Sequence, residues 1–147
     1  MESGLENLEV YRIAHELAVQ IHRMSLGLPS FERFEEAQQI RRSSKRVSAC
    51  IVEGYTLRKY KALYLNFLYR ALASSDETQE HLKLLKETGS LLDAAVYQSL
   101  SETSTELSRK LFRFIQGVEQ CHEPPNYLSG SQLDDPGPAP EDEEFLG

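Results

Sequence analysis

Residues 37–54 read AQQIRRSSKRVSACIVEG, and small or apolar side chains recur in this stretch at steps of three and four. The recurring positions are Ala37, Ile40, Ser44, Val47, Ile51 and Gly54. An α-helix turns once every 3.6 residues, so this spacing places all six on one face. The stretch therefore predicts a helix over about residues 34–57 with one continuous buried stripe.

The same spacing continues on both sides of this stretch. A segment over about residues 8–27 stops before Pro29, and another over about 60–88 closes at Gly89. A fourth segment starts near Asp93, whose carboxylate can cap a helix. No run alternates polar and β-branched residues, so strands are not expected. Segments of similar length joined by short loops predict an all-α fold, an up-down-up-down four-helix bundle.

Charge is distributed unevenly along the 147 residues, whose net charge is −7. Residues 41–70 carry eight basic groups and one acidic group, whereas residues 122–147 carry seven acidic groups and no basic one. The second stretch also holds five of the six prolines. We therefore expect a bundle over residues 1–121 and a disordered proline-rich acidic tail over 122–147.

The basic groups of the second and third segments are candidates for binding phosphates. Measured from Ile40 at 100° per residue, the bases of the second helix lie opposite the buried stripe, and further bases follow at the next turn. The candidate nucleic-acid-binding residues are Arg41, Arg42, Lys45, Arg46, Arg58, Lys59 and Lys61. The alternative is a solvated face paired with neighbouring acids such as Glu35, Glu36 and Glu53.

The third segment is apolar on more than one face. Residues 62–72 read ALYLNFLYRAL, and Leu65 and Tyr69 are left over once the remaining large side chains face the bundle. Either this helix is unusually buried or a second face contacts another subunit. Leu65 and Tyr69 are therefore the candidate oligomer interface.

Patterns typical of enzymes and metal sites are missing from the sequence. His15 and His22 lie two helical turns apart, and the only Glu-x-x-His pair is Glu119 with His122. No glycine-rich phosphate loop or nucleophile elbow occurs, so we expect neither catalysis nor a cofactor. No window approaches the roughly 18 apolar residues of a membrane span. The polar start of the chain and its two separated cysteines favour a cytoplasmic protein.

Four stretches in this order carry a family resemblance: LEVYRIAHELA (8–18), LPSFERF (28–34), QQIRRSSKRVSACIVEGY (38–55) and FLYRALASSDETQEHL (67–82). They resemble bacterial four-helix bundle proteins first noticed as open reading frames in intervening sequences of large-subunit ribosomal RNA. The same fold includes the accessory variability protein of diversity-generating retroelements. The resemblance covers about residues 5–120 and excludes the tail.

The resemblance implies a homopentameric barrel with a positively charged surface and no enzymatic activity. For the retroelement branch it also implies a complex with a reverse transcriptase and its template RNA. Lys45 and Arg46 add charge where the family pattern is usually neutral, which favours that branch. We therefore expect a non-enzymatic accessory protein that binds RNA or DNA phosphates through its basic surface. The alternative is a structural or protein-interaction scaffold of the ribosomal-RNA branch, with the basic face on an acidic protein.

Overall fold

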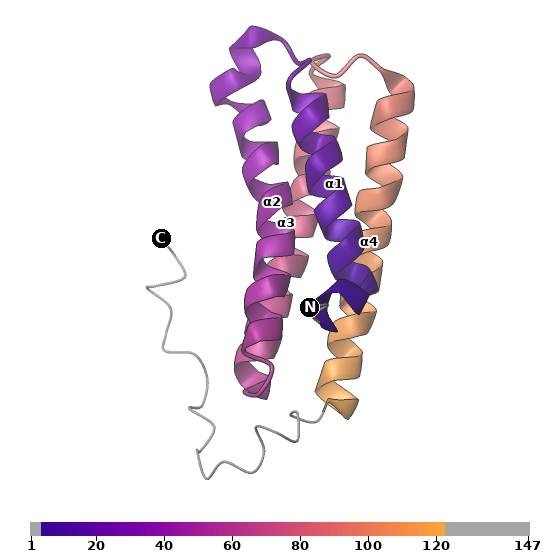
Figure 1. The fold of residues 1–147 in the computed structure, drawn as a ribbon. Coiled ribbons are helices and arrows are strands. Elements are labelled where there is room, and N and C mark those ends of the chain that lie inside the picture. The colour runs from indigo at the N-terminus through magenta and orange to yellow at the C-terminus, as the bar shows by residue number, and fades with distance from the viewer. Residues whose placement is uncertain (1–3, 123–147) are drawn as a thin grey trace.

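A computed structural model describes residues 4–122 of the chain, and these residues form helices joined by short connections (Figure 1). The four α-helices are α1 (Glu9–Ser25), α2 (Glu36–Thr56), α3 (Lys61–Glu87) and α4 (Ala94–Cys121). Short 3-10 helices, η1 (Gly4–Asn7) and η2 (Ser30–Phe34), precede α1 and α2. Residues 4–122 contain no strand, so the predicted all-α class is confirmed. The expected disordered tail covers residues 122–147, and apart from His122 it lies outside the described residues.

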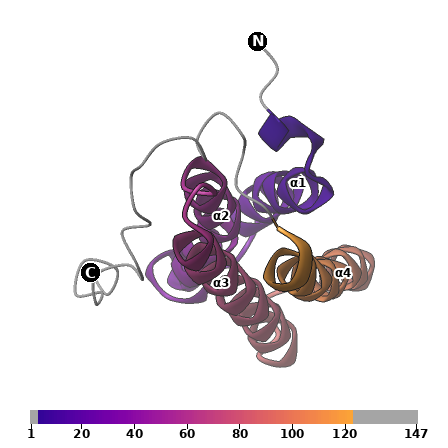
Figure 2. The same cartoon turned by 90° about the horizontal axis from the view of Figure 1, so that it is seen from below.

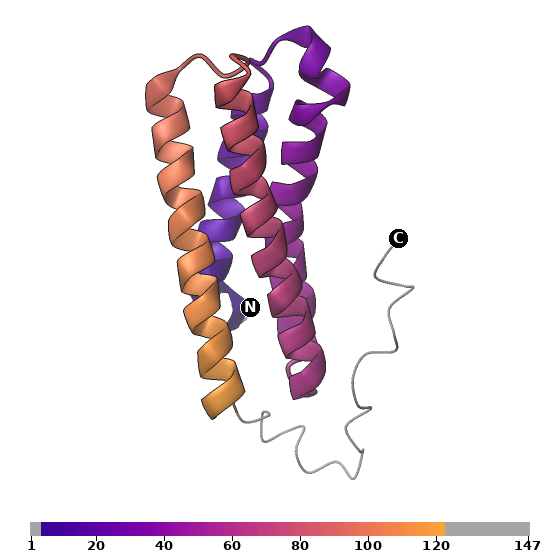
Figure 3. The same cartoon turned by 180° about the vertical axis from the view of Figure 1, so that it is seen from behind.

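The helices run alternately up and down. The α1–α2 and α3–α4 connections lie at one end, which we call the loop end (Figure 1). The α2–α3 turn lies at the opposite end, the turn end, where α1 also begins and α4 stops (Figures 1 and 3). Seen along the bundle axis, the helices occupy four corners in chain order, so that α4 is diagonal to α2 (Figure 2). The predicted bundle topology is therefore confirmed.

Two predicted helix boundaries have a clear physical cause. The Asp93 carboxylate accepts hydrogen bonds from the backbone N–H groups of Ala95 and Val96, at 3.0 and 3.1 Å, as a helix cap does. Beyond the end of α3, Gly89 has a φ of 82°, a left-handed conformation that glycine adopts without steric cost. The backbone N–H of Leu91 then turns back to the carbonyl of Leu85 at 2.9 Å. These contacts set where α3 ends and where α4 begins.

The core consists of the apolar stripes that the sequence predicts, and it draws on all four helices. The largest side chains with less than 2% exposure are mostly aliphatic: Leu17, Ile21, Ile40, Ile51, Leu68, Leu82, Leu85, Leu107, Leu111, Ile115 and Val47. Burial of one such side chain contributes roughly 1.5–3 kcal/mol to stability. The amphipathic stripes therefore supply the main force that holds the four helices together.

The α2 and α3 helices approach closely near the turn end, at Gly54. This glycine is buried, and a Cβ atom added to it would lie 3.0 Å from Phe67 Cβ and 3.3 Å from Tyr64 Cδ1. Those distances are shorter than ordinary carbon contacts of about 3.5–4.0 Å. A residue without a side chain is therefore required for this helix crossing.

Hydroxyl groups also cross the interior of the bundle. Ser43 of α2 pairs with Thr78 of α3 at 2.9 Å between oxygens, and Ser75 of α3 pairs with Ser108 of α4 at 2.7 Å. Ser43, Ser75 and Thr78 are each at most 3% exposed, so their hydroxyls rely on protein partners rather than on bulk water. Ser43 and Thr78 also bond to the carbonyls of Ile40 and Ser74 in their own helices. We call Ser43, Ser75, Thr78 and Ser108 the hydroxyl cluster.

Candidate functional site

Three neighbouring bases project from the middle of α2 into solvent: Arg42, Lys45 and Arg46. We call these residues the basic ridge. None of the three makes an ion pair with a carboxylate among residues 4–122. Of the acids that could neutralise them, Glu36 contacts His81 at 2.6 Å, and Glu53 forms no ion pair within residues 4–122. The ridge therefore presents uncompensated positive charge.

Arg41 differs from the expectation of a solvent-facing arginine. It is half-buried, and its guanidinium donates hydrogen bonds to Ser25 Oγ at 3.0 Å and to the Arg33 carbonyl at 3.3 Å. A second contact fixes the same end, because Ser90 Oγ donates to the buried Glu32 carboxylate at 2.6 Å. Arg41 thus ties α1 and η2 to α2 at the loop end. Its partners lie 16 and 8 residues away along the chain, beyond what the pattern of one helix can predict.

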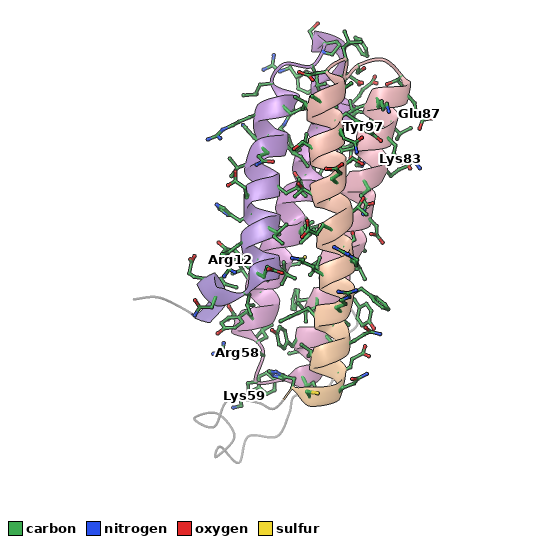
Figure 4. All side chains as sticks on the ribbon, turned by 90° about the vertical axis from the view of Figure 1, so that its right-hand side faces the viewer. Arg12, Arg58, Lys59, Lys83, Glu87 and Tyr97 are labelled. Carbon is green, nitrogen blue, oxygen red and sulfur yellow. The ribbon has the colours of Figure 1, made fainter. Side chains whose placement is uncertain are left out.

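The other predicted bases are Arg58, Lys59 and Lys61. They lie at the turn end, where Arg58 and Lys59 are labelled in Figure 4, and they contact nearby aromatic rings and backbone carbonyls. The Arg58 guanidinium lies 4.0 Å from the centre of the Tyr55 ring and donates to the Tyr55 carbonyl at 2.9 Å. Lys61 Nζ donates to the Glu119 carbonyl at 2.8 Å. Ten residues of α2 lead from Arg46 to the helix end at Thr56, roughly 15 Å along the axis, and Arg58 follows in the turn. The seven candidate bases therefore do not form one surface.

A pocket of about 730 Å³ opens at the turn end and is lined by residues of all four α-helices. Its walls include the aromatic rings of Tyr55, Tyr64 and Phe114, and Lys110 and Arg113 also line it. Lys110 pairs with Glu9 at 2.6 Å, and this hydrogen bond raises the pKa of Lys110. Burial raises the pKa of Tyr64 to about 12. This pocket could not be predicted from the sequence, because its walls come from four separate helices.

Leu65 and Tyr69, the candidate interface residues, both have contacts within the chain. Tyr69 is 47% exposed, and its hydroxyl donates to Glu119 Oε1 at 2.6 Å, which raises the pKa of the tyrosine. Leu65 is partly buried against the cluster that contains Leu68 and Ile115. Both side chains therefore lie toward α4, which accounts for part of the extra apolar surface of α3.

Four of the eight large exposed apolar side chains within residues 4–122 belong to the connections at the loop end: Leu26, Phe31, Phe34 and Leu92. Phe34 is 76% exposed and Leu92 is 86% exposed. The sequence signal for this patch was the pair of phenylalanines in LPSFERF, outside any helical stripe. Such a patch is typical of a contact surface.

The cysteines and histidines do not assemble into a reactive centre in the described part of the chain. Cys50 is buried in the core, and that burial raises the pKa of its thiol. His81 lies between two carboxylates, with Glu36 on Nδ1 and Glu77 on Nε2. Across residues 4–122, no group of three metal-ligating side chains is close enough to hold an ion. No helix in the same range is both long and apolar enough to cross a membrane.

The helical part of the chain is similar to known proteins. Residues 6–113 match the family described as the 23S rRNA-intervening sequence protein. A similar solved structure is a protein of unknown function from the S23 ribosomal protein family of Bacteroides thetaiotaomicron VPI-5482, with 30% sequence identity. The two structures align with a TM-score of 0.66 over 73% of this chain and 95% of the other. A comparison with curated proteins finds no match.

Proposed function

The chain belongs to the 23S rRNA-intervening sequence protein family, and on this premise we propose that it binds nucleic acid, RNA above all, through the basic ridge. The observation that carries the proposal is the lack of any carboxylate partner for Arg42, Lys45 and Arg46 in residues 4–122. The family description adds support, since it connects these proteins with ribosomal RNA.

The ridge has the geometry that a phosphate backbone requires. Residues three or four apart on a helix have Cβ atoms about 5–6 Å apart, so Arg42 lies next to both Lys45 and Arg46. Each phosphate that a base neutralises releases counterions into the solvent, and an arginine can hold two phosphate oxygens at once. None of the three bases has a carboxylate partner within residues 4–122, so they can engage phosphates without first breaking an ion pair. This favours binding that is strong at low salt and independent of sequence.

We propose further that the protein acts as a non-enzymatic accessory to a nucleic-acid enzyme, such as the reverse transcriptase of a retroelement with its template RNA. The resemblance to accessory variability proteins supports this role, and so does the added charge of Lys45 and Arg46 on α2. The competing hypothesis is a scaffold whose ridge contacts an acidic protein surface. A basic ridge alone suits both partners, so a competition experiment must separate them.

The salt dependence of RNA binding tests this function. We expect a labelled single-stranded RNA to bind in fluorescence anisotropy titrations, with log K falling linearly against log salt at a slope of about −2 for three phosphates. Duplex DNA should bind as well, because phosphate contacts carry no sequence information. Failure to bind RNA at 50 mM salt would contradict the proposal. Displacement of RNA by poly-glutamate at equal charge concentration would favour the acidic-protein scaffold instead.

We also propose that several copies assemble into a ring, a homopentamer as the resemblance implies. The exposed apolar patch at the loop end supports an assembly, together with the half-exposed Tyr69 on α3. Light scattering at micromolar concentration should give a mass near five times the 16.8 kDa of one chain. Replacement of Leu65 and Tyr69 by aspartate should lower that mass, because charge in an apolar interface loses its hydration. A native mass of one chain would rule out the ring.

A further inference from the structure

A second basic feature lies beside the ridge, in a pocket between α1 and α2. The pocket has a volume of about 320 Å³ and is lined by His15, Ala18, Val19, His22, Arg23, Lys45 and Ser48. Five of these residues belong to α1, whose charged groups the sequence analysis did not connect with binding. We call it the α1–α2 pocket.

Every titratable group that lines the α1–α2 pocket is basic. Arg23 and Lys45 are exposed, and neither the guanidinium nor the ammonium makes an ion pair or side-chain hydrogen bond within residues 4–122. No acidic residue lines the pocket. The neighbouring acid Glu16 accepts a hydrogen bond from Gln20. The charge of this pocket therefore favours an anion.

The two ring nitrogens of His22 differ in their surroundings. Nδ1 is buried, whereas Nε2 lies on the accessible side of the ring. Neither nitrogen has a hydrogen-bond partner within the described residues. An unpaired buried N–H is rarer and costlier than an unpaired acceptor, so the proton of the neutral ring belongs on Nε2. His22 can therefore donate a hydrogen bond from its accessible side.

The apolar wall of the pocket and its closeness to the basic ridge indicate which anion it would bind. Ala18 and Val19 give it an apolar wall, and a lower local dielectric strengthens the attraction between a cation and an anion. Lys45 belongs both to the pocket and to the ridge, and Arg42 is one helical turn away. A nucleic-acid strand held on the ridge would thus bring its next phosphate to the mouth of this pocket.

We propose that the α1–α2 pocket is a phosphate subsite that takes one backbone phosphate of the RNA bound on the ridge, with Arg23, Lys45 and His22 as its donors. The proposal rests on the proposed function, and it extends the binding surface from one helix to two. It also assigns a role to α1, whose exposed face otherwise has no part in binding.

Histidine signals in NMR spectra test the subsite, because the chain holds four histidines with distinct surroundings. His15 and His22 line the pocket, whereas His81 is held by Glu36 and Glu77, and His122 contacts the Arg58 carbonyl at 3.0 Å. The ring signals are assigned with single His-to-Gln variants of the full chain. Titration with a short RNA lacking a terminal phosphate should shift the signals of His15 and His22 and leave those of His81 and His122 in place.

Two further titrations separate the sources of phosphate. Inorganic phosphate alone should shift the same two signals only at much higher concentration, because it lacks the contacts on the ridge. An RNA carrying a 5′-phosphate should act like the RNA without one. Shifts that require the terminal phosphate, or that appear with inorganic phosphate but not with RNA, would overturn the proposal of a backbone subsite.

A matched pair of variants gives an independent measurement. Replacement of His22 and Arg23 by glutamine should weaken RNA binding about tenfold, whereas Arg109→Gln on α4 should leave binding nearly unchanged. Arg109 is exposed on the helix diagonal to α2, so the control removes the same cationic charge far from the ridge. If RNA binds but neither the histidine signals nor the affinity of the double variant changes, the subsite is wrong while the ridge stands. If no RNA binds to the native chain, the proposed function itself fails.

Discussion

Simultaneous replacement of Arg42, Lys45 and Arg46 by glutamate is expected to weaken RNA binding by roughly 100-fold or more at low salt. Each base lost removes a phosphate contact, and each glutamate gained repels the strand. The slope of log K against log salt should also become shallower, by about 2 for a single-stranded RNA. Anisotropy titrations at three salt concentrations measure both quantities.

Thermal unfolding and the helical circular dichroism of this triple variant should stay close to native, because all three side chains are exposed and leave no cavity. Replacement of Lys83, Arg109 and Arg113 by glutamate is the matched control, since it makes the same change in charge at exposed positions of α3 and α4. Equal losses of binding in the two variants would show that net charge, rather than the ridge, governs binding.

Gly54→Val is expected to lower the free energy of unfolding by about 3 kcal/mol, the upper part of the range for overpacked cores. The valine Cβ alone would lie 3.0 Å from Phe67 Cβ, and its two methyl groups would enter space already filled by α3. The α2 and α3 helices would have to separate near the turn end. Urea denaturation followed by circular dichroism at 222 nm measures the change.

Gly117 on α4 is the matched control for backbone effects, because a Cβ built there meets nothing within 4 Å. Gly117→Ala should therefore stabilise the protein by up to about 1 kcal/mol, through the higher helix propensity of alanine. Opposite signs for Gly54→Val and Gly117→Ala are the expected outcome. A Gly54→Val protein as stable as the native chain would show that α2 and α3 do not pack as closely as the structure has them.

Local sequence patterns were sufficient to predict the helices, because both their periodicity and their ends depend on near neighbours. The predicted segments 8–27, 34–57 and 60–88 correspond to α1 (9–25), α2 (36–56) and α3 (61–87). Asp93 and Gly89 were recognised as boundary residues because a cap and a left-handed turn each involve only a few adjacent residues. The 3-10 helix η2 was not predicted, since five residues are too few for a periodic pattern.

The contacts of individual long side chains were harder to predict from the sequence. The helical wheel placed Arg41 with the ridge, yet a guanidinium can reach partners on other elements, and Ser25 and Arg33 supply them. The Tyr69 hydroxyl likewise donates a hydrogen bond to Glu119, fifty residues further along the chain. For Arg42, Lys45 and Arg46 the wheel was sufficient to predict exposure, because no carboxylate on another element of residues 4–122 pairs with them. The α1–α2 pocket depends on how two helices pack, which no single helix reveals.

The hydroxyl cluster has a consequence for the alignment of the helices along the bundle axis. Apolar contacts have no direction, so leucine and isoleucine stripes would tolerate a slide of α3 past α2 by one turn, about 5.4 Å. Such a slide would part Ser43 from Thr78 and Ser75 from Ser108. The buried Ser75 hydroxyl would lose Ser108, and a buried hydroxyl left unpaired costs about 1–3 kcal/mol. Ser43 and Thr78 would lose each other but keep the carbonyls of Ile40 and Ser74. These pairs of small polar residues thereby favour one axial offset for three helices, and that offset sets the height at which α2 presents its bases relative to α3 and α4.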